Sequence, residues 1–335
     1  MSYQNQLTSV IGFTSTVPVE IIFAAGLAPI DLNNLFIASD RPELLVKQAE
    51  SDGFSHNICA WIKGIYSVTL NNDIKQVIAV MGGDCSNTIA LAEILSRKGV
   101  KIISFEYPLN KDRDFLASQM DRLRLALSTN WDKIEESKQR LDAIRAKLIE
   151  IDRLTFEEDV VSGLENHLFL VSSSDFGSDP DKFEKGLDNF IEEARKRSPR
   201  KDEIRLGFLG VPPILGNFYD FIESLGGRVV FNEVQRQFSM PYPHEDIVDR
   251  YLKYTYPYNI EGRMEDIRSA VKKRNLDGLI HYTQTFCFRQ LYDMIIRRES
   301  SVPVLTLEGD RPGKIDSRVA LRIETFIEML RDRKE

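Results

Sequence analysis

The 335-residue sequence has little cysteine and no long hydrophobic run. Three cysteines without a secretion signal argue against a disulfide framework. No apolar stretch approaches the roughly 20 residues that a membrane-spanning helix needs. The N-terminus also lacks the basic region and apolar core of a signal peptide. We therefore expect a cytoplasmic protein that has no part in a membrane.

Several common catalytic motifs are missing as well. No G-x-G-x-x-G segment follows a strand-like run and no G-x-x-x-x-G-K-[ST] occurs, which removes the sequence support for nicotinamide and P-loop nucleotide binding. The metal-binding H-E-x-x-H motif and the G-x-S-x-G nucleophile motif are absent. A formal net charge of −7 disfavours nucleic acid or an anionic membrane surface as a partner.

What the sequence does contain is a regular alternation of strand-like and helix-like segments. Nearly continuous apolar strands that alternate with helices are typical of parallel sheets. We therefore predict an α/β fold with two doubly wound parallel-sheet domains, flavodoxin-like or Rossmann-like, and a helical insertion between them. The predicted strands cover residues 9–13, 28–32, 76–81, 100–105, 204–210, 228–232, 277–282 and 302–307.

The two series of strands are separated by a charged, helical stretch. Residues 111–156 carry apolar side chains at helical spacing, which predicts two or three amphipathic helices with a solvated charged face. Residues 180–197 form another predicted helix, and residues 198–202 are a candidate linker. The expected organisation is an N-terminal α/β domain at 1–110 with Cys59 and Cys85, a helical segment at 111–200 and a C-terminal α/β domain at 201–335 with Cys287.

The three cysteines occur where a ligand site is expected in such a fold. Cys85 and Cys287 follow apolar runs, and Cys59 lies at or just before the start of a predicted helix within residues 57–70. Ligands gather at the carboxyl ends of strands in open α/β sheets. Each thiol alone would equally suit a core. Together, three thiolates could bind Zn²⁺ with one open position, or a [4Fe–4S] cluster with one iron free of protein ligands.

Acidic residues and histidines near predicted strand ends are candidates for proton transfer. Glu233 and Glu308 end predicted strands at the sheet edge expected for Cys287, although capping of the next helix would explain them equally well. His281 lies on the strand before Cys287, and His244 follows a Pro-Tyr-Pro run. Histidine is the side chain most often used in acid–base catalysis.

Both ends of the sequence carry recognisable motifs. Residues 18–29, Pro-Val-Glu-Ile-Ile-Phe-Ala-Ala-Gly-Leu-Ala-Pro, are similar to a P-x-E-L-x-x-A-A-G-x-x-P segment. Residues 303–310 and 321–330 are similar to a PvLxLExD and RIEaFiEml ending, and residues 277–287 to a DGvi and kfC segment. These motifs resemble the 2-hydroxyacyl-CoA dehydratase and benzoyl-CoA reductase family, and the chain looks like a D-component subunit of such a dehydratase over nearly its whole length.

The resemblance implies a [4Fe–4S] cluster on Cys59, Cys85 and Cys287, which fall on the family's three cysteine positions. It also implies a separate ATP-hydrolysing iron–sulfur activator that injects one low-potential electron, and a homodimer or a heterodimer with a homologous subunit. In a dehydratase of this kind the electron passes to the thioester carbonyl of an acyl-CoA, and the ketyl radical expels the hydroxyl group. Benzoyl-CoA reductases apply related chemistry to an aromatic ring.

We therefore expect an oxygen-sensitive iron–sulfur lyase or oxidoreductase with its cluster between two α/β domains. Glu233, His281 and Glu308 would orient the substrate or transfer protons. Residues 231–241 read as a loop that lines the site and could select a substrate other than an acyl-CoA thioester. A non-catalytic electron-transfer or scaffold subunit, paired with a catalytic homologue, is an alternative, and a zinc hydrolase on the same three thiols is a third.

Overall fold

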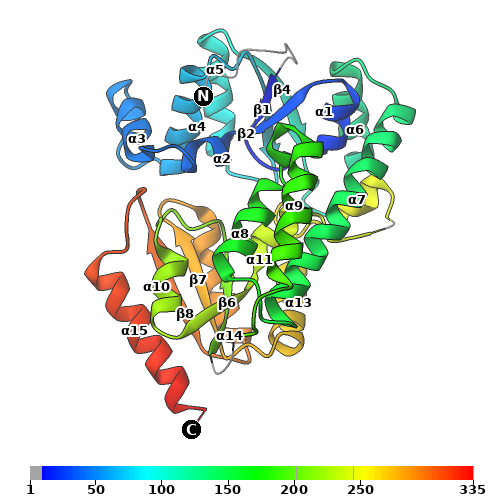
Figure 1. The fold of residues 1–335 in the computed structure, drawn as a ribbon. Helices are drawn as coiled ribbons and strands as arrows, with labels where there is room; N and C mark the ends of the chain where they lie inside the picture. Colours follow the sequence, from blue (N-terminus) through cyan, green and yellow to red (C-terminus); the bar gives the residue numbers. More distant parts are fainter. Residues whose placement is uncertain (1–9, 201–202, 244, 335) are drawn as a thin grey trace.

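The chain forms two four-stranded sheets in which neighbouring strands run parallel (Figure 1). The computed structural model describes residues 10–200, 203–243 and 245–334. The strand orders β2-β1-β3-β4 and β6-β5-β7-β8 repeat one arrangement. The bounds are Val10–Phe13 (β1), Ala28–Asp31 (β2), Gln76–Gly82 (β3), Lys101–Glu106 (β4), Ile204–Leu209 (β5), Gly227–Asn232 (β6), Gly278–Gln284 (β7) and Val304–Gly309 (β8).

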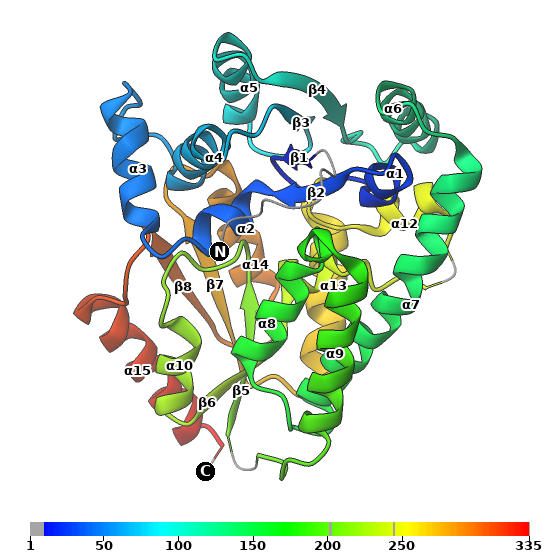
Figure 2. The ribbon, with the colours of Figure 1, turned by 45° about the horizontal axis from the view of Figure 1, so that its top comes forward.

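Helices cover both faces of the first sheet (Figure 2). Helices α1 and α6 lie on one side, and α4 and α5 pack against each other on the opposite side. Helix α5 buries Leu91 and Leu95, four residues apart, which is the spacing of one helix face. The bounds are Val19–Ala24 (α1), Leu32–Ile37 (α2), Pro42–Ser51 (α3), Ala60–Asn71 (α4), Asn87–Arg97 (α5) and Arg113–Ala126 (α6).

The second sheet is also covered on both faces, which confirms the predicted pair of doubly wound α/β units. Ile222 of α10 and Ile327 of α15 pack with the strand residue Leu206 on one face. Met264 of α13 and Ile296 of α14 pack together on the other. The bounds are Phe218–Ser224 (α10), Glu233–Phe238 (α11), Ile247–Lys253 (α12), Ile260–Lys273 (α13), Phe288–Tyr292 (η2), Asp293–Glu299 (α14) and Ser317–Asp332 (α15).

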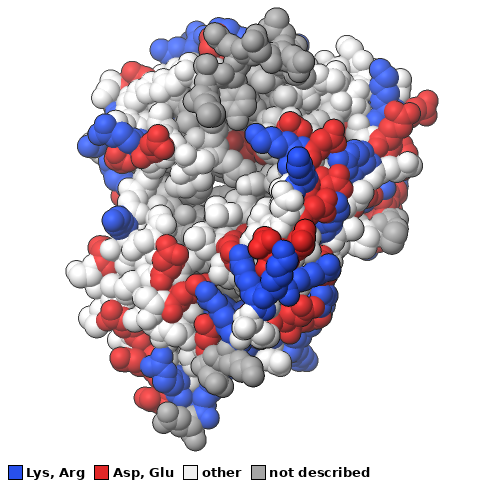
Figure 3. All heavy atoms as spheres, viewed as in Figure 1, with Lys and Arg blue, Asp and Glu red and all other residues white. Residues whose placement is uncertain are grey.

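The helical segment between the sheets contacts both halves. The 26-residue helix α7 packs against α1, while α8 packs against β6 and α11. Charged side chains join α7 to α9: Arg140 lies 2.6 Å from Asp181, and Lys147 lies 2.8 Å from Glu184. Figure 3 shows mixed positive and negative charge over this flank. The bounds are Trp131–Phe156 (α7), Gly163–Ser172 (α8), Phe176–Ser178 (η1) and Pro180–Ala194 (α9).

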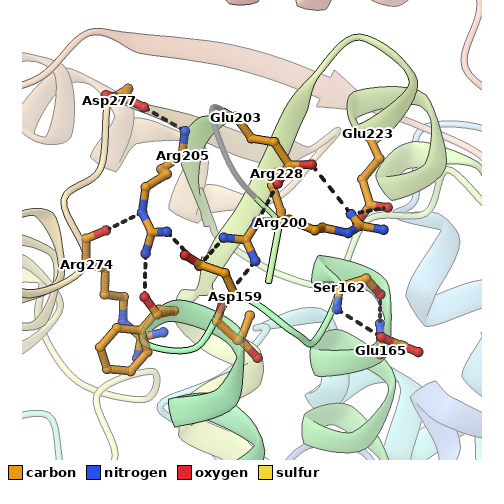
Figure 4. Close-up of polar contacts among 12 residues, drawn as sticks. Asp159, Ser162, Glu165, Arg200, Glu203, Arg205, Glu223, Arg228, Arg274 and Asp277 are labelled. Atoms are coloured by element: carbon orange, nitrogen blue, oxygen red, sulfur yellow. Dashed lines mark hydrogen bonds and ion pairs between the residues drawn. The ribbon is translucent and has the colours of Figure 1, made fainter. Parts of the chain in front are cut away.

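One carboxylate between α7 and α8 ties this segment to the second sheet (Figure 4). Asp159 pairs with Arg205 of β5 at 2.7 Å and with the buried Arg228 of β6. The Arg205 guanidinium also donates to the carbonyl of Phe156, the last residue of α7, at 2.6 Å. These bonds hold the connection between α7 and α8 beside the starts of β5 and β6, and α8 contributes to the site described below.

The expectation that residues 231–241 form a loop is wrong, because Glu233–Phe238 form helix α11. Val234 is buried in this helix, and Glu233 is held by a pair of hydrogen bonds from Arg263. These tertiary contacts stabilise a helix of fewer than two turns, which is too short to be stable by itself. Among the described helices, none combines the length and apolarity that crossing a membrane requires.

Candidate functional site

Cys59, Cys85 and Cys287 line one cavity of about 140 Å³. The cavity lies at the carboxyl ends of strands from both sheets, because its lining includes the segments that follow β1, β2, β3, β5 and β7. This is the position at which parallel α/β sheets bind their ligands. The structure therefore brings together the three thiols that are far apart in the sequence, and both halves of the molecule contribute to the site.

Each thiol is placed by the start of a helical element. Cys59 is the N-terminal capping residue of α4 and is 7% exposed. Cys85 lies between β3 and α5, and Cys287 precedes the 3-10 turn η2. The backbone two residues before Cys85 requires a glycine. Gly83 has φ +84°, and a Cβ at this position would lie 2.7 Å from the Cβ of Tyr107. Gly83 thus sets the path that delivers Cys85 to the cavity.

Backbone N–H groups approach each sulfur from two residues further along the chain. The N–H of Trp61 faces the thiol of Cys59, that of Asn87 faces Cys85, and that of Arg289 faces Cys287. Hydrogen bonds to sulfur favour the thiolate, and they are one of the means by which proteins adjust the potential of an iron–sulfur cluster. The same local geometry therefore recurs at all three thiols.

Burial keeps the free thiols neutral. It raises the pKa of Cys59 to about 12, and the N–H groups and neighbouring thiols have smaller effects. Burial likewise raises the pKa of Cys85 to about 11 and raises that of Cys287. Three adjacent thiolates would repel each other in such a place unless a cation bound them. A metal centre, which deprotonates its thiol ligands, would supply that cation.

The arrangement of the thiols does not form a compact single-ion site. Within residues 10–200, 203–243 and 245–334, no group of three or more His, Cys, Asp or Glu side chains is placed to hold one metal ion. The thiols surround a cavity instead of meeting at a point. A zinc site would need all of its sulfur ligands about 2.3 Å from one centre.

Arg289 links the two halves beside the thiols. Its guanidinium donates to the carbonyl of Gly83 at 2.8 Å and lies 4.2 Å from the ring centre of Tyr256. Although desolvation dominates and raises the pKa of Asp84, the charge of Arg289 acts in the opposite direction. Sequence reasoning missed Arg289, which stands only two residues after Cys287.

Two aspartates also line the cavity, and the sequence analysis did not predict them as site residues. Asp31 is the last residue of β2 and accepts a hydrogen bond from the backbone N–H of Asn33 at 2.9 Å, and Asp84 precedes Cys85. Desolvation raises the pKa of both carboxyls. Behind Asp31, burial and the charge of Asp31 raise the pKa of Asp175 to about 7. The sequence signal that could have identified Asp31 and Asp84 is their position at or just after the end of a predicted strand.

Of the three predicted acid–base residues, Glu233 is buried and already paired. Both of its carboxylate oxygens accept from Arg263, at 2.6 and 2.8 Å, and one also accepts from the N–H of Gly210 at 3.0 Å. Burial is the largest single influence and raises its pKa, but the charge and hydrogen bonds of Arg263, together with the N–H of Gly210, hold the pKa below its usual value. It does not line the cavity of the thiols.

His281 and Glu308 are placed apart from the thiol cavity as well. The Nδ1 of the buried His281 lies 2.7 Å from an oxygen of Asp293, and the residue lines a smaller cavity that Cys287 also borders. Glu308 lies exposed on β8. His244 is outside the described residues. The catalytic roles of Glu233, His281 and Glu308 stay predictions.

Helix α8 brings a further histidine to the cavity. The helix starts with a capping box in which Ser162 and Glu165 exchange hydrogen bonds, and this fixes its first turn. His167, the residue after the buried Asn166, lines the cavity, and its ring centre lies 4.9 Å from that of Tyr219. Burial lowers the pKa of His167 to about 3, so the imidazole is neutral. No motif in the sequence marks this residue.

The fold and the site define a class: a protein of two parallel α/β units with a thiol-lined site where their strands end. The chain matches the family model described as 2-hydroxyglutaryl-CoA dehydratase, D-component, over residues 14–330. The chain therefore belongs to this family, which confirms the resemblance seen in its terminal motifs. Comparison with curated proteins found no significant match.

Proposed function

We propose that this chain is an iron–sulfur subunit of the 2-hydroxyacyl-CoA dehydratase and benzoyl-CoA reductase type, with one [4Fe–4S] cluster on Cys59, Cys85 and Cys287. One observation carries the proposal: all three cysteines of the chain line the same cavity. In such a cluster each thiolate binds a different iron. Three thiols at one cavity provide one ligand for each of three irons, and family membership favours this group over the single zinc ion of the hydrolase alternative.

When bound, the cluster would supply electrons one at a time at low potential. The chain's own residues would hold and shield it. The backbone N–H groups of Trp61, Asn87 and Arg289 face the three sulfurs, and the Arg289 guanidinium places a positive charge beside them. Hydrophobic side chains of the lining limit the access of water, which also affects the potential.

Family membership supports the remaining parts of the proposal. The electrons would come from a separate ATP-dependent iron–sulfur activator, and the chain would work as a homodimer or with a homologous subunit. The substrate would be an acyl-CoA thioester. A cytoplasmic location, expected from the sequence, is part of the same proposal.

The proposal is tested by purifying the protein without oxygen and measuring iron, acid-labile sulfide and the EPR spectrum after reduction. We expect the content of one [4Fe–4S] cluster per chain, and its loss in Cys59→Ser, Cys85→Ser and Cys287→Ser. Ile89→Ser is the matched control, because Ile89 is exposed on α5 near Cys85 and brings no thiol. Zinc in place of iron, or a full cluster in any of the cysteine variants, would contradict the proposal.

One observation favours the non-catalytic alternative. Glu233 and His281, two of the three predicted acid–base residues, are already engaged by Arg263 and Asp293. A subunit that only carries electrons would need no free acid or base. Binding of an acyl-CoA thioester to the cluster-loaded chain separates the two functions, because an electron-transfer or scaffold subunit would leave the thioester unbound.

A further inference from the structure

The cavity that the thiols share has carboxyls but no basic side chain among its described lining residues. Asp31 and Asp84 are the two acidic residues of the lining. His167 does not supply the missing positive charge, because burial lowers its pKa to about 3 and the ring is neutral. A negatively charged group that entered this cavity would therefore meet carboxyls without a cation to pair with.

The arginines of the adjoining smaller cavity are already engaged. Arg263 donates hydrogen bonds from Nε and Nη2 to the two carboxylate oxygens of Glu233, at 2.6 and 2.8 Å. Arg289 donates to the carbonyl of Gly83 and stacks on Tyr256. Drawing either arginine toward a ligand would break these bonds, and in the case of Arg263 it would leave a buried carboxylate unpaired.

The rest of the lining suits a neutral ligand. Hydrophobic side chains from both halves form much of the wall: Ile37, Ile65, Val171, Val211 and Phe238. Two polar atoms of lining residues, Nε1 of Trp61 and Nδ1 of His167, are shielded from water and have no hydrogen-bond partner among the described residues. A buried polar atom without a partner is unfavourable, so a neutral ligand whose hydroxyl group came within reach of either ring would be stabilised there.

We propose that the cavity accepts an uncharged 2-hydroxyacyl group and rejects a dicarboxylic one, such as the 2-hydroxyglutaryl group in the family's name. This inference rests on the proposed function and adds the class of acyl group. A 2-hydroxyglutaryl thioester keeps one free carboxylate, which loses its hydration on entering the cavity and finds no cation in return. An uncharged acyl chain instead packs on the apolar wall, and its hydroxyl group can bond to Trp61 or His167.

Binding of two thioesters to the anaerobically purified full chain tests this selectivity. The chain has two tryptophans, so Trp131→Phe leaves Trp61 as the only indole, and its fluorescence reports on the cavity. We expect 2-hydroxybutanoyl-CoA to bind at least about tenfold more tightly than 2-hydroxyglutaryl-CoA. In the same background, His167→Phe keeps a ring against Tyr219 and should weaken binding of 2-hydroxybutanoyl-CoA severalfold.

A gain of binding provides the complementary experiment. Ile37→Lys places a cation on the cavity wall at the C-terminal end of α2, where a helix tolerates positive charge. We expect it to raise the affinity for 2-hydroxyglutaryl-CoA about tenfold. Leu44→Lys is the matched control, because Leu44 is exposed on α3 and does not line the cavity; it should change neither affinity.

Equal binding of the two thioesters, or tighter binding of 2-hydroxyglutaryl-CoA, would overturn the inference while leaving the iron–sulfur function in place. Failure of both thioesters to bind to protein that contains its cluster would overturn it as well. The iron content is measured on the same samples. Selective binding by protein that lacks iron would instead support the inference and contradict the proposed electron chemistry.

Discussion

Cys85 and Cys287 occupy equivalent positions in the two sheets. β3 and β7 are the third strands in the orders β2-β1-β3-β4 and β6-β5-β7-β8. Strand β3 ends at Gly82 and β7 at Gln284, so each cysteine comes three residues after its strand. The sulfur of each also faces the backbone N–H two residues further on. The two halves thus present the same element of one repeated architecture to a shared cavity.

This equivalence predicts similar behaviour of Cys85→Ser and Cys287→Ser. Both thiols are half-buried, so we expect each change to alter the free energy of unfolding of the metal-free protein by less than about 1 kcal/mol. Cys59→Ser buries a hydroxyl at a 7% exposed position and should cost more, about 1–3 kcal/mol. Urea unfolding of the metal-free variants measures the three values, and equal costs at all three positions would contradict this ranking.

Arg289 should raise the reduction potential of a cluster bound to the three thiols. Its guanidinium is buried near Cys287, and a positive charge stabilises the reduced, more negative state. We expect Arg289→Gln to lower the midpoint potential by on the order of 60 mV, which is a tenfold change for one electron. Arg289→Lys keeps the charge and is the control. An EPR-monitored redox titration that found equal potentials for Arg289→Gln and the native protein would exclude this role.

The pairing of Glu233 with Arg263 predicts a structural role for Glu233 that stability measurements can separate from catalysis. Removing one partner leaves a buried charge, which typically costs about 3–5 kcal/mol. Glu233→Gln should therefore lower the free energy of unfolding by an amount of this order. The double variant Glu233→Gln with Arg263→Met removes both charges and should recover part of the loss. A catalytic Glu233 would show the reverse pattern, with activity lost and stability nearly unchanged.

The raised pKa of Asp175 predicts that the stability of the fold decreases as the pH rises from about 4 to about 7. Burial and the charge of Asp31 raise the pKa of Asp175 to about 7, above its value in the unfolded chain. The folded state therefore binds the proton more tightly, and unfolding becomes easier as the pH rises toward the folded pKa, with no further change above it.

The substitution Asp31→Asn tests this pair. It removes the neighbouring charge, and an amide oxygen can still accept from the N–H of Asn33. Urea unfolding at several pH values should show a flatter dependence in this variant, whereas the exposed Asp40→Asn should follow the native protein. A native protein whose stability is constant from pH 5 to 7 would contradict the assignment.

The eight strands could be predicted because each is a short, nearly continuous apolar run. Buried parallel strands have hydrophobic neighbours on both faces, and this leaves a strong pattern in the sequence. The short helices α2 and α12 lack such a pattern. Helix α2 starts directly after β2, where Asp31 accepts from the N–H of Asn33, and its Leu32 and Phe36 are buried by tertiary contacts.

The sequence was sufficient to predict that the three thiols belong to one site. It was not sufficient to predict the other side chains around them. Cys85 and Cys287 follow recognisable strands, so their meeting at the sheet ends follows from topology. His167 reaches the cavity because α8 is held against the second sheet by tertiary contacts, which include the hydrogen bond from Asn232 to Asn166. The partners of Glu233 and His281 lie 30 and 12 residues away, so the sequence around these residues does not show that they are already bonded.

Because Cys59 and Cys85 belong to one half and Cys287 to the other, a group bound by all three would act as a crosslink. It would join segments that are also connected by the hydrogen bond from Arg289 to Gly83 and by the ion pair between Arg311 and Glu50. Binding to the folded form alone would add to its stability according to the affinity and concentration of the bound group. A bound cofactor would therefore also oppose separation of the two halves at the cavity.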